Sequence, residues 1–346
     1  MVNNLIMARS RNRKKHFLLI VILFVLLIFV CFASLCMGQY YVSPLNVIKI
    51  LFSNFFSLNM TWTETMYKVV INNRLPRIIA AILVGTALSI AGASYQGVFR
   101  NPLVSPDLLG VSNGACVGAA FSIIMGLGYL GNVVFSFVGG LLAVIITVLF
   151  PTILNKKSTV SLVLSGVIVG GFFSSVLGLL KYIADPDTEL AEITYWQLGS
   201  LARVKMDLIY FIAPIIIVGS AIVFALRWRI NVISLGDKEA QMLGVNIFRE
   251  RGIIIICATL LTAASICISG TIGWIGLIMP HLARMIVGQD NKKVIPVSAL
   301  MSASFLVIVD TISRNLTGAE IPLGIITGFV GTPFFAFVLI RQKNKE

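Results

Sequence analysis

Residues 17–37 read FLLIVILFVLLIFVCFASLCM, an unbroken apolar run that follows five basic residues. About 20 apolar residues, each rising 1.5 Å along a helix, cross the hydrocarbon core of a bilayer. The run is longer than the apolar part of a signal peptide, and no small-x-small cleavage site follows it. The sequence therefore predicts a retained membrane helix whose N-terminal end lies in the cytoplasm.

The rest of the chain has the same apolar character. Its 346 residues are 58% hydrophobic and 12% charged, whereas soluble domains average roughly 25% charged residues. This composition excludes a soluble enzyme, a disordered chain and a disulfide scaffold, and predicts an all-α polytopic membrane protein. We expect a basic cytoplasmic segment (1–16) followed by a single transmembrane domain (17–343). Ten apolar segments are predicted to cross the membrane, the eighth of them short: 17–37, 74–96, 108–127, 130–153, 160–182, 207–227, 252–271, 274–288, 293–313 and 322–341.

The net charge of +13 would suggest nucleic acid as a partner in a soluble protein. In a membrane protein an excess of basic residues indicates instead how the chain is oriented in the membrane, because basic residues collect in cytoplasmic loops. With ten spans and both termini inside, the inner segments carry 19 basic and 6 acidic residues, and the outer segments carry 8 of each. The charge asymmetry therefore supports cytoplasmic termini, and no nucleic-acid partner is expected.

Ionisable residues are sparse within the apolar segments, which argues against an ion-coupled carrier. Asp310 and Arg314 have the i,i+4 spacing of an ion pair on one helix face. The chain has no G-x-x-x-x-G-K-[ST] motif, so it cannot bind ATP through a P-loop. The five cysteines lie in apolar runs, and His16 and His281 are the two histidines. We therefore predict no metal site and no enzymatic activity, and any driving energy must come from a partner.

The largest predicted cytoplasmic loop contains a candidate docking helix. Ser234 and Asp237 fit a capping box, and Gly244 fits a helix C-cap. Leu235 and Leu243 can share one apolar stripe with Ala240. A helix of this kind could rest on lipid, but its mixed charge favours a protein partner.

Pairs of glycines spaced four residues apart occur in three of the apolar segments, at 114/118, 166/170 and 324/328. Small residues at this spacing let membrane helices approach closely. The pattern predicts a tightly packed interior or a subunit interface.

Several short motifs then follow one another in a recognisable order: RLPR at 74–77, GASYQG at 92–97, NPL at 101–103, PDLLGVSNGA at 106–115, the LG and LGV pairs between 235 and 245, GTIGWIGLIMPHLAR at 270–284, D-x-x-x-R at 310–314, and PLGIITG with G-x-P at 322–333. The chain resembles, from about residue 40 to 343, the permease family of binding-protein-dependent ABC importers for iron–siderophores, haem and cobalamin, the FecCD type.

The resemblance implies a fold like that of the cobalamin-importer permease, with ten helices per subunit, in the cytoplasmic membrane. It implies a second permease subunit, identical or different, two cytoplasmic ATPase subunits and an extracellular or periplasmic substrate-binding protein. ATP would be bound by the partners, and this chain would hold no cofactor itself. An iron(III)–siderophore type chelate is the expected cargo, and cobalamin and haem remain alternatives.

The resemblance also assigns roles to residues. Arginines at the outer helix ends would pair with carboxylates of the binding protein: Arg74, Arg77 and Arg314. A coupling helix at 234–246 would enter a cleft of the ATPase through Ser234, Leu235, Gly236, Asp237, Ala240, Met242, Leu243 and Gly244. A cytoplasmic gate would be formed around Asn101, Ser158 and Thr159. The pathway between two subunits would be lined by Ser165, Gly166, Ser174, Thr327 and Phe334.

Other interpretations explain fewer features. A secondary carrier working alone lacks coupling residues, and a membrane receptor or scaffold gives no reason for the two gating turns. Four acidic residues in the segment 183–206 could suggest a cation site, but a solvated face is the favoured interpretation: Asp185, Asp187, Glu189 and Glu192. A short outer helix is expected at 190–200, and His281 is expected to be structural.

Overall fold

The computed structural model describes residues 2–53, 61–153 and 158–343, and the elements within these ranges are all helical. Seven helical segments are long and apolar enough to cross a membrane: α1 (Val2–Cys36), the continuous segment α3–η1–α4 (Glu64–Tyr67, Lys68–Arg74 and Leu75–Val98), α6 (Gly128–Ile153), α7 (Thr159–Ile183), α9 (Met206–Leu235), α11 (Ile247–Ser269) and α13 (Asn291–Leu316). The all-α membrane architecture predicted from composition is confirmed.

Three further apolar helices fall on the remaining predicted segments: α5 (Val111–Ile124), α12 (Ile275–Val287) and α14 (Leu323–Lys343). At 14 and 13 residues, α5 and α12 are too short to span a bilayer alone. Each of the ten predicted segments thus contains a helix, and seven meet the length of a span. The other elements are short: α2 (Pro44–Phe52), η2 (Pro106–Leu109), α8 (Glu189–Leu198) and α10 (Asp237–Met242).

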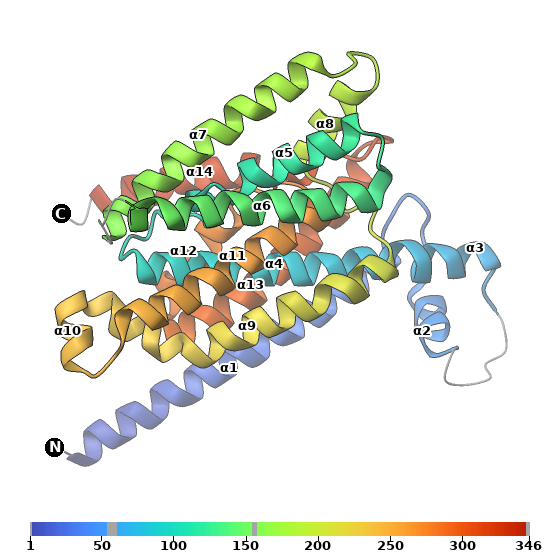
Figure 1. Ribbon diagram of the computed structural model, residues 1–346. Helices are drawn as coiled ribbons and strands as arrows, with labels where there is room; N and C mark the ends of the chain where they lie inside the picture. The colour runs from blue at the N-terminus through green and yellow to red at the C-terminus, as the bar shows by residue number, and fades with distance from the viewer. Residues whose placement is uncertain (1, 54–60, 154–157, 344–346) are drawn as a thin grey trace.

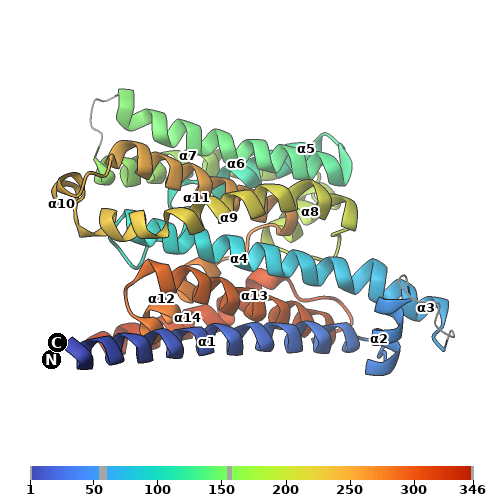
Figure 2. The same cartoon turned by 90° about the horizontal axis from the view of Figure 1, so that it is seen from below.

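The long helices run side by side, and the bundle has two distinct ends (Figure 1). Helix α10 lies at one end, where α1 begins and α14 ends, and we call this the α10 end. Helices α2, α3 and α8 lie at the opposite end, the α8 end, and the view from below shows the same division (Figure 2). The chain therefore starts and finishes on the side that carries α10.

Helix α4 occupies the centre of the bundle and packs against α9, α11, α12 and α13. Of its most apolar 18-residue window 78% is buried, against 11% for the peripheral α1. Small residues allow this central position: Gly85 faces the backbone of Ser302 on α13, and Gly92 faces the backbone of Gly276 on α12. Close approach of backbones at these glycines lets α4 pack tightly against α12 and α13.

Gly92 gives a direct test of this packing. A Cβ atom at this position would lie 1.7 Å from the carbonyl oxygen of Gly276, so Gly92→Ala should force α4 and α12 apart and destabilise the protein by about 1–3 kcal/mol. Thermal unfolding in detergent measures the loss. Gly252→Ala is the matched control, because a Cβ atom at residue 252 would have no neighbouring atom within 4 Å. Equal melting of the two variants would contradict the packing argument.

Two of the three glycine pairs predicted to allow close packing, 114/118 and 166/170, do so within this chain. Gly114 and Gly118 of α5 face the backbones of Gly139 and Phe135 on α6. On α7, Gly166 faces Leu108 of the η2 turn. The prediction of a tightly packed interior is therefore confirmed for these residues.

The η2 turn explains why α5 is short. The sequence predicted a helix from residue 108, but Gly110 adopts φ 79° and ends η2, so α5 starts at Val111. Pro106 packs over Gly276, and the hydroxyl of Thr147 on α6 donates to the carbonyl oxygen of Leu109 at 3.1 Å. Non-helical backbone at this level is tolerated because neighbouring helices supply its hydrogen bonds and cover it.

Candidate functional site

The α10 end carries a compact helix-turn unit. Helix α9 continues to Leu235, and Gly236 (φ 140°) turns the chain into α10. Gly244 (φ 75°) ends the unit in a left-handed conformation, as the C-cap prediction expected. The predicted capping box is wrong, because Ser234 is itself helical and its hydroxyl donates to the carbonyl oxygen of Asn231 at 2.7 Å.

One face of this unit is buried and the other is open. Ala240 is fully buried and packs with Val232, Val245 and Ile247. The side of α10 toward α11 is fixed by an ion pair of 2.7 Å between Arg251 and Asp237. The three residues of the predicted stripe therefore do not share one face. Ala240 faces inward, whereas Leu235 and Leu243 are exposed.

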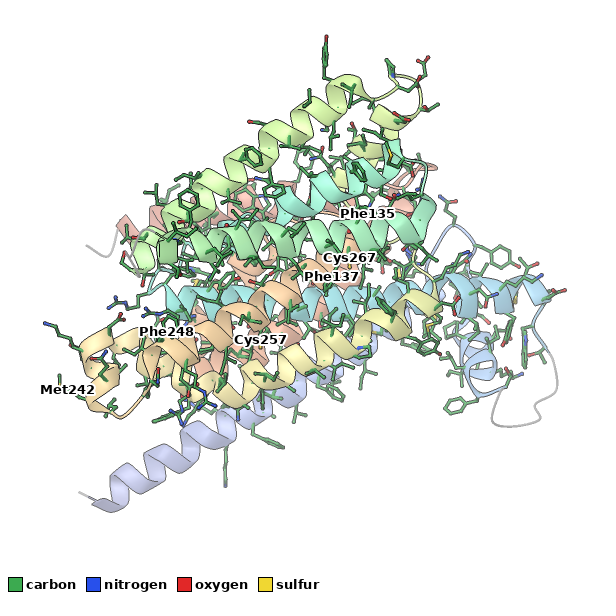
Figure 3. All side chains as sticks on the ribbon, viewed as in Figure 1. Phe135, Phe137, Met242, Phe248, Cys257 and Cys267 are labelled. Carbon is green, nitrogen blue, oxygen red and sulfur yellow. The ribbon has the colours of Figure 1, made fainter. Side chains whose placement is uncertain are left out.

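Three large apolar side chains cover the open face of the unit. Leu235 is 63% exposed, Met242 79% and Leu243 58%, and Met242 lies at the far edge of the molecule (Figure 3). Apolar groups gathered on a surface in this way mark a site of association with another protein or with a membrane.

A network of buried charges lies at the α8 end. The guanidinium of Arg77 donates to Asp310 Oδ1 from Nη2 at 2.8 Å and to Glu320 Oε1 from Nη1 at 2.6 Å. Arg314 Nε lies 3.1 Å from Asp310 Oδ2, and Arg314 Nη2 donates to the hydroxyl of Ser34 at 2.7 Å. The Asp310–Arg314 pair predicted from spacing is confirmed, and Asp310 is shared with a second arginine.

Arg74 lies beside this network and binds backbone rather than carboxylate. It donates to the carbonyl oxygens of Leu35 at 2.6 Å, Cys36 at 3.2 Å and Tyr40. These oxygens include carbonyls at the C-terminal end of α1, which have no partner within the helix and carry partial negative charge. Arg74 thereby ties α1 to the start of α4.

The three arginines that the sequence proposed for docking lie together. Arg74, Arg77 and Arg314 are 4%, 6% and 7% exposed. All three line one hollow of about 750 Å³ at the α8 end. Other charged residues on its wall are Arg203, Lys205 and Glu320. Arginine and lysine outnumber the carboxylates there, which makes the hollow a region of positive potential.

The two predicted gate turns lie at the α10 end of the bundle. Asn101 is exposed, and its side-chain oxygen accepts a bond of 2.9 Å from the amide of Leu103. Ser158 caps α7 by accepting from the amide of Ser161 at 3.1 Å, and Thr159 begins the helix. Two of the 19 basic residues counted on the cytoplasmic side, Lys156 and Lys157, lie outside the described residues.

The residues predicted to line a pathway lie in three different environments. Ser165 and Gly166 are buried on the side of α7 that meets η2, whereas Ser174 is exposed. Thr327 and Phe334 of α14 line an apolar cavity of about 140 Å³ beside Trp274. The exposed side of α7 also presents Gly171 and Gly178, which have no neighbouring atom within 4 Å of a Cβ position.

The acidic segment at the α8 end is a capped turn followed by a helix. Asp185 accepts from the amides of Asp187 and Thr188 and from the Thr188 hydroxyl, and these bonds hold the pKa of its carboxyl below the usual range. Helix α8 follows, close to the predicted helix 190–200, and Glu192 forms an ion pair of 2.6 Å with Arg203. Among the described residues, no group of three or more histidine, cysteine or acidic side chains could hold a metal ion.

Comparison with known proteins identifies the architecture. Residues 26–341 match the model of the FecCD transport family. The chain belongs to this family. It is 36% identical over 320 residues to the molybdate import system permease MolB of Haemophilus influenzae, covering 92% of this chain and 94% of that one. It is 39% identical over 278 residues to a probable iron chelatin transport system permease of Helicobacter pylori, covering 80% and 83% of the two chains.

A solved structure agrees with this assignment. An inward-facing transporter of the metal-chelate ABC type superposes with a TM-score of 0.83 at 33% identity, covering 93% of this chain and 98% of that one. The chain is thus a FecCD-type ABC transporter permease and a multi-pass membrane protein. FecCD relatives are named for different cargoes, so membership of the family does not specify what this permease carries.

Proposed function

We propose that this FecCD permease forms the membrane channel of an importer for an iron(III)–siderophore type chelate, with both termini and α10 in the cytoplasm. The observation that carries the proposal is the separation of two surfaces, an apolar one on α10 and a cationic hollow at the α8 end. Each is suited to a different partner, and the bundle between them connects the two. The excess of basic residues in the segments assigned to the α10 side supports the orientation.

The α10 surface is proposed to enter a cleft of the ATPase. Leu235, Met242 and Leu243 would be buried there, and Asp237 and Arg251 would keep α10 fixed to the bundle while force passes through it. Two ATPase subunits and two permease subunits, identical or different, would make up the assembly. Because this chain lacks a P-loop, the ATP would be bound by the ATPase alone.

The pathway is proposed to run between the two permease subunits along the open side of α7 and along α14. Small residues on α7, among them Ser174 and Gly171, leave a smooth wall that does not hold a bulky cargo tightly. Asn101 and the Ser158–Thr159 turn would close the cytoplasmic end. Ser165, Gly166 and Thr327 would support this wall from behind, since they are buried in the single chain.

The cationic hollow is proposed to receive carboxylates of a substrate-binding protein. Charge reversal of Arg74 and Arg314 together should weaken binding-protein docking by at least about tenfold, measured on permease in nanodiscs with the binding protein encoded beside it. Since both side chains also hold internal bonds, only the folded fraction isolated by gel filtration should be used. Arg203→Glu, at the exposed rim of the same hollow, breaks only an exposed ion pair with Glu192, which contributes little to folding. This variant should also weaken docking, and unchanged docking of both variants would overturn the assignment.

Uptake by cells lacking this gene tests the cargo. Accumulation of radioactive iron supplied as a ferric siderophore should be lost, and restored by the intact gene. Cobalamin, haem and molybdate supplied separately serve as the alternatives. Loss of uptake of one of these, with ferric chelate uptake unchanged, would replace the proposed cargo and leave the importer assignment in place.

A further inference from the structure

Asp107 is a carboxylate that the assignments above leave unexplained. It lies in the η2 turn, six residues after Asn101, and its side chain is exposed on the surface of the single chain. The hydroxyl of Ser112, in the first turn of α5, donates to Asp107 Oδ1. No ion pair formed among the described residues includes Asp107.

Three neighbouring helices place the turn at membrane depth. Gly166, which contacts Leu108, is seven residues into α7, and Thr147, which binds Leu109, is six residues before the end of α6. At 1.5 Å per residue, the positions of Gly166 in α7 and Thr147 in α6 each put the turn about 10 Å inside the helix ends on the α10 side. Gly92, linked to Pro106 through Gly276, is six residues before the end of α4 and gives the same depth.

This depth lies within the hydrocarbon layer. Helices α6 and α7 have 26 and 25 residues, about 38 Å of helix, while the hydrocarbon core is about 30 Å thick. Each helix end then extends about 4 Å beyond the core, and the turn lies roughly 5 Å inside its boundary. An ionised carboxylate does not face lipid at this level; such groups face a water-filled cavity or another protein surface.

We propose that Asp107 faces the aqueous pathway of the permease and gives it a preference for cationic over anionic cargo. The position of η2 supports this: the turn contacts α7 at Gly166 and Gly170, next to the exposed residues Gly171 and Ser174. A second permease subunit would add a second wall, and an identical one would add a second carboxylate. The inference rests on the proposed pathway and narrows its cargo to chelates that present positive charge or hydrogen-bond donors.

A thiol reporter measures the charge preference without knowledge of the cargo. Ser105 directly precedes η2, its side chain makes no capping hydrogen bond, and it is partly exposed. Ser105→Cys therefore adds a thiol two residues from Asp107 with little loss of stability. The full-length chain in nanodiscs is treated with two methanethiosulfonates of similar size, one bearing trimethylammonium and one bearing sulfonate. The chain without the reporter gives the background from the native cysteines.

The cationic reagent should react faster, and Asp107→Asn should lower the ratio of the two rates by about tenfold, as expected for one charge within a nanometre at intermediate dielectric. Asp207→Asn, the same change at the exposed start of α9 on the α8 end, should leave the ratio unchanged. No labelling by either reagent would show that the turn is covered, and labelling with a ratio insensitive to Asp107→Asn would show that the carboxylate sets no preference. Either result overturns the inference. Failure of the ATPase to assemble with the permease would instead overturn the proposed function, and the labelling does not depend on it.

Discussion

Replacing Leu243 with Asp should stop cargo uptake while leaving the permease folded. The leucine side chain is 58% exposed in the single chain, and burying it in a partner's cleft would contribute about 1.5–3 kcal/mol. A carboxylate in the same place loses that contribution and must also be desolvated without a partner. ATP hydrolysis by the reconstituted complex should no longer respond to loaded binding protein, and uptake should fall at least about tenfold.

Two controls separate coupling from general damage. Leu127→Asp makes the same change at a 47% exposed leucine in the turn before α6, at the opposite end of the bundle, and should leave the response of the ATPase intact. Lys238→Glu changes a charge on α10 itself without altering its apolar face. Coupled uptake by the Leu243→Asp complex at the normal rate would mean that α10 is not the coupling element.

Replacing Asp310 with Ala should be among the most destabilising single substitutions in the chain. Its carboxylate serves both Arg77 and Arg314, whose side chains are 7% and 8% exposed. Removing one partner of a buried ion pair costs about 3–5 kcal/mol, because the remaining charge stays buried without compensation. For a chain of this length that corresponds to a fall in melting temperature of roughly 4–7 °C, measurable in detergent by thermal unfolding.

Two carboxylates that are more exposed than Asp310 serve as comparisons for its substitution. Glu320 shares Arg77 but is 35% exposed, so Glu320→Gln should lower the melting temperature less. Glu64 pairs with Lys68 at 2.6 Å on an open surface, at 80% and 62% exposure, and Glu64→Gln should have an effect below about 0.5 kcal/mol. If the three variants melted at one temperature, the buried network would not be a determinant of stability.

Hydropathy predicted the membrane helices well because a span is a local property of about 20 residues. It did not predict that α5 starts at Val111, since that depends on the left-handed conformation of Gly110 and on the hydroxyl that Thr147 offers from another helix. The capping box failed for a similar reason. Ser234 has a suitable sequence, but α9 extends through it, and its hydroxyl bonds within the helix.

In the candidate sites, too, local sequence patterns predicted only contacts between residues that are close in the chain. The Asp310–Arg314 pair could be predicted because four residues of helix bring the two side chains together. The bonds from Arg77 to Asp310 cross 233 residues of sequence, and no local pattern indicates them. The exposure of Leu235 and Leu243, with Ala240 turned inward, required the positions of Val232 and Ile247. Motif resemblance located these residues, while three-dimensional packing decided which way each faces.

The long separation within the charge network has a consequence for biosynthesis. Arg77 emerges from the ribosome 233 residues before Asp310, a delay of about 12–47 s at 5–20 residues per second. During that time Arg77 lacks its carboxylate partners Asp310 and Glu320, and Ser34 lacks Arg314, which follows it by 280 residues. The first helix and the penultimate one are thus joined only when nearly the whole chain has been inserted. A permease truncated before α13 would therefore leave Arg77 without the carboxylates of Asp310 and Glu320.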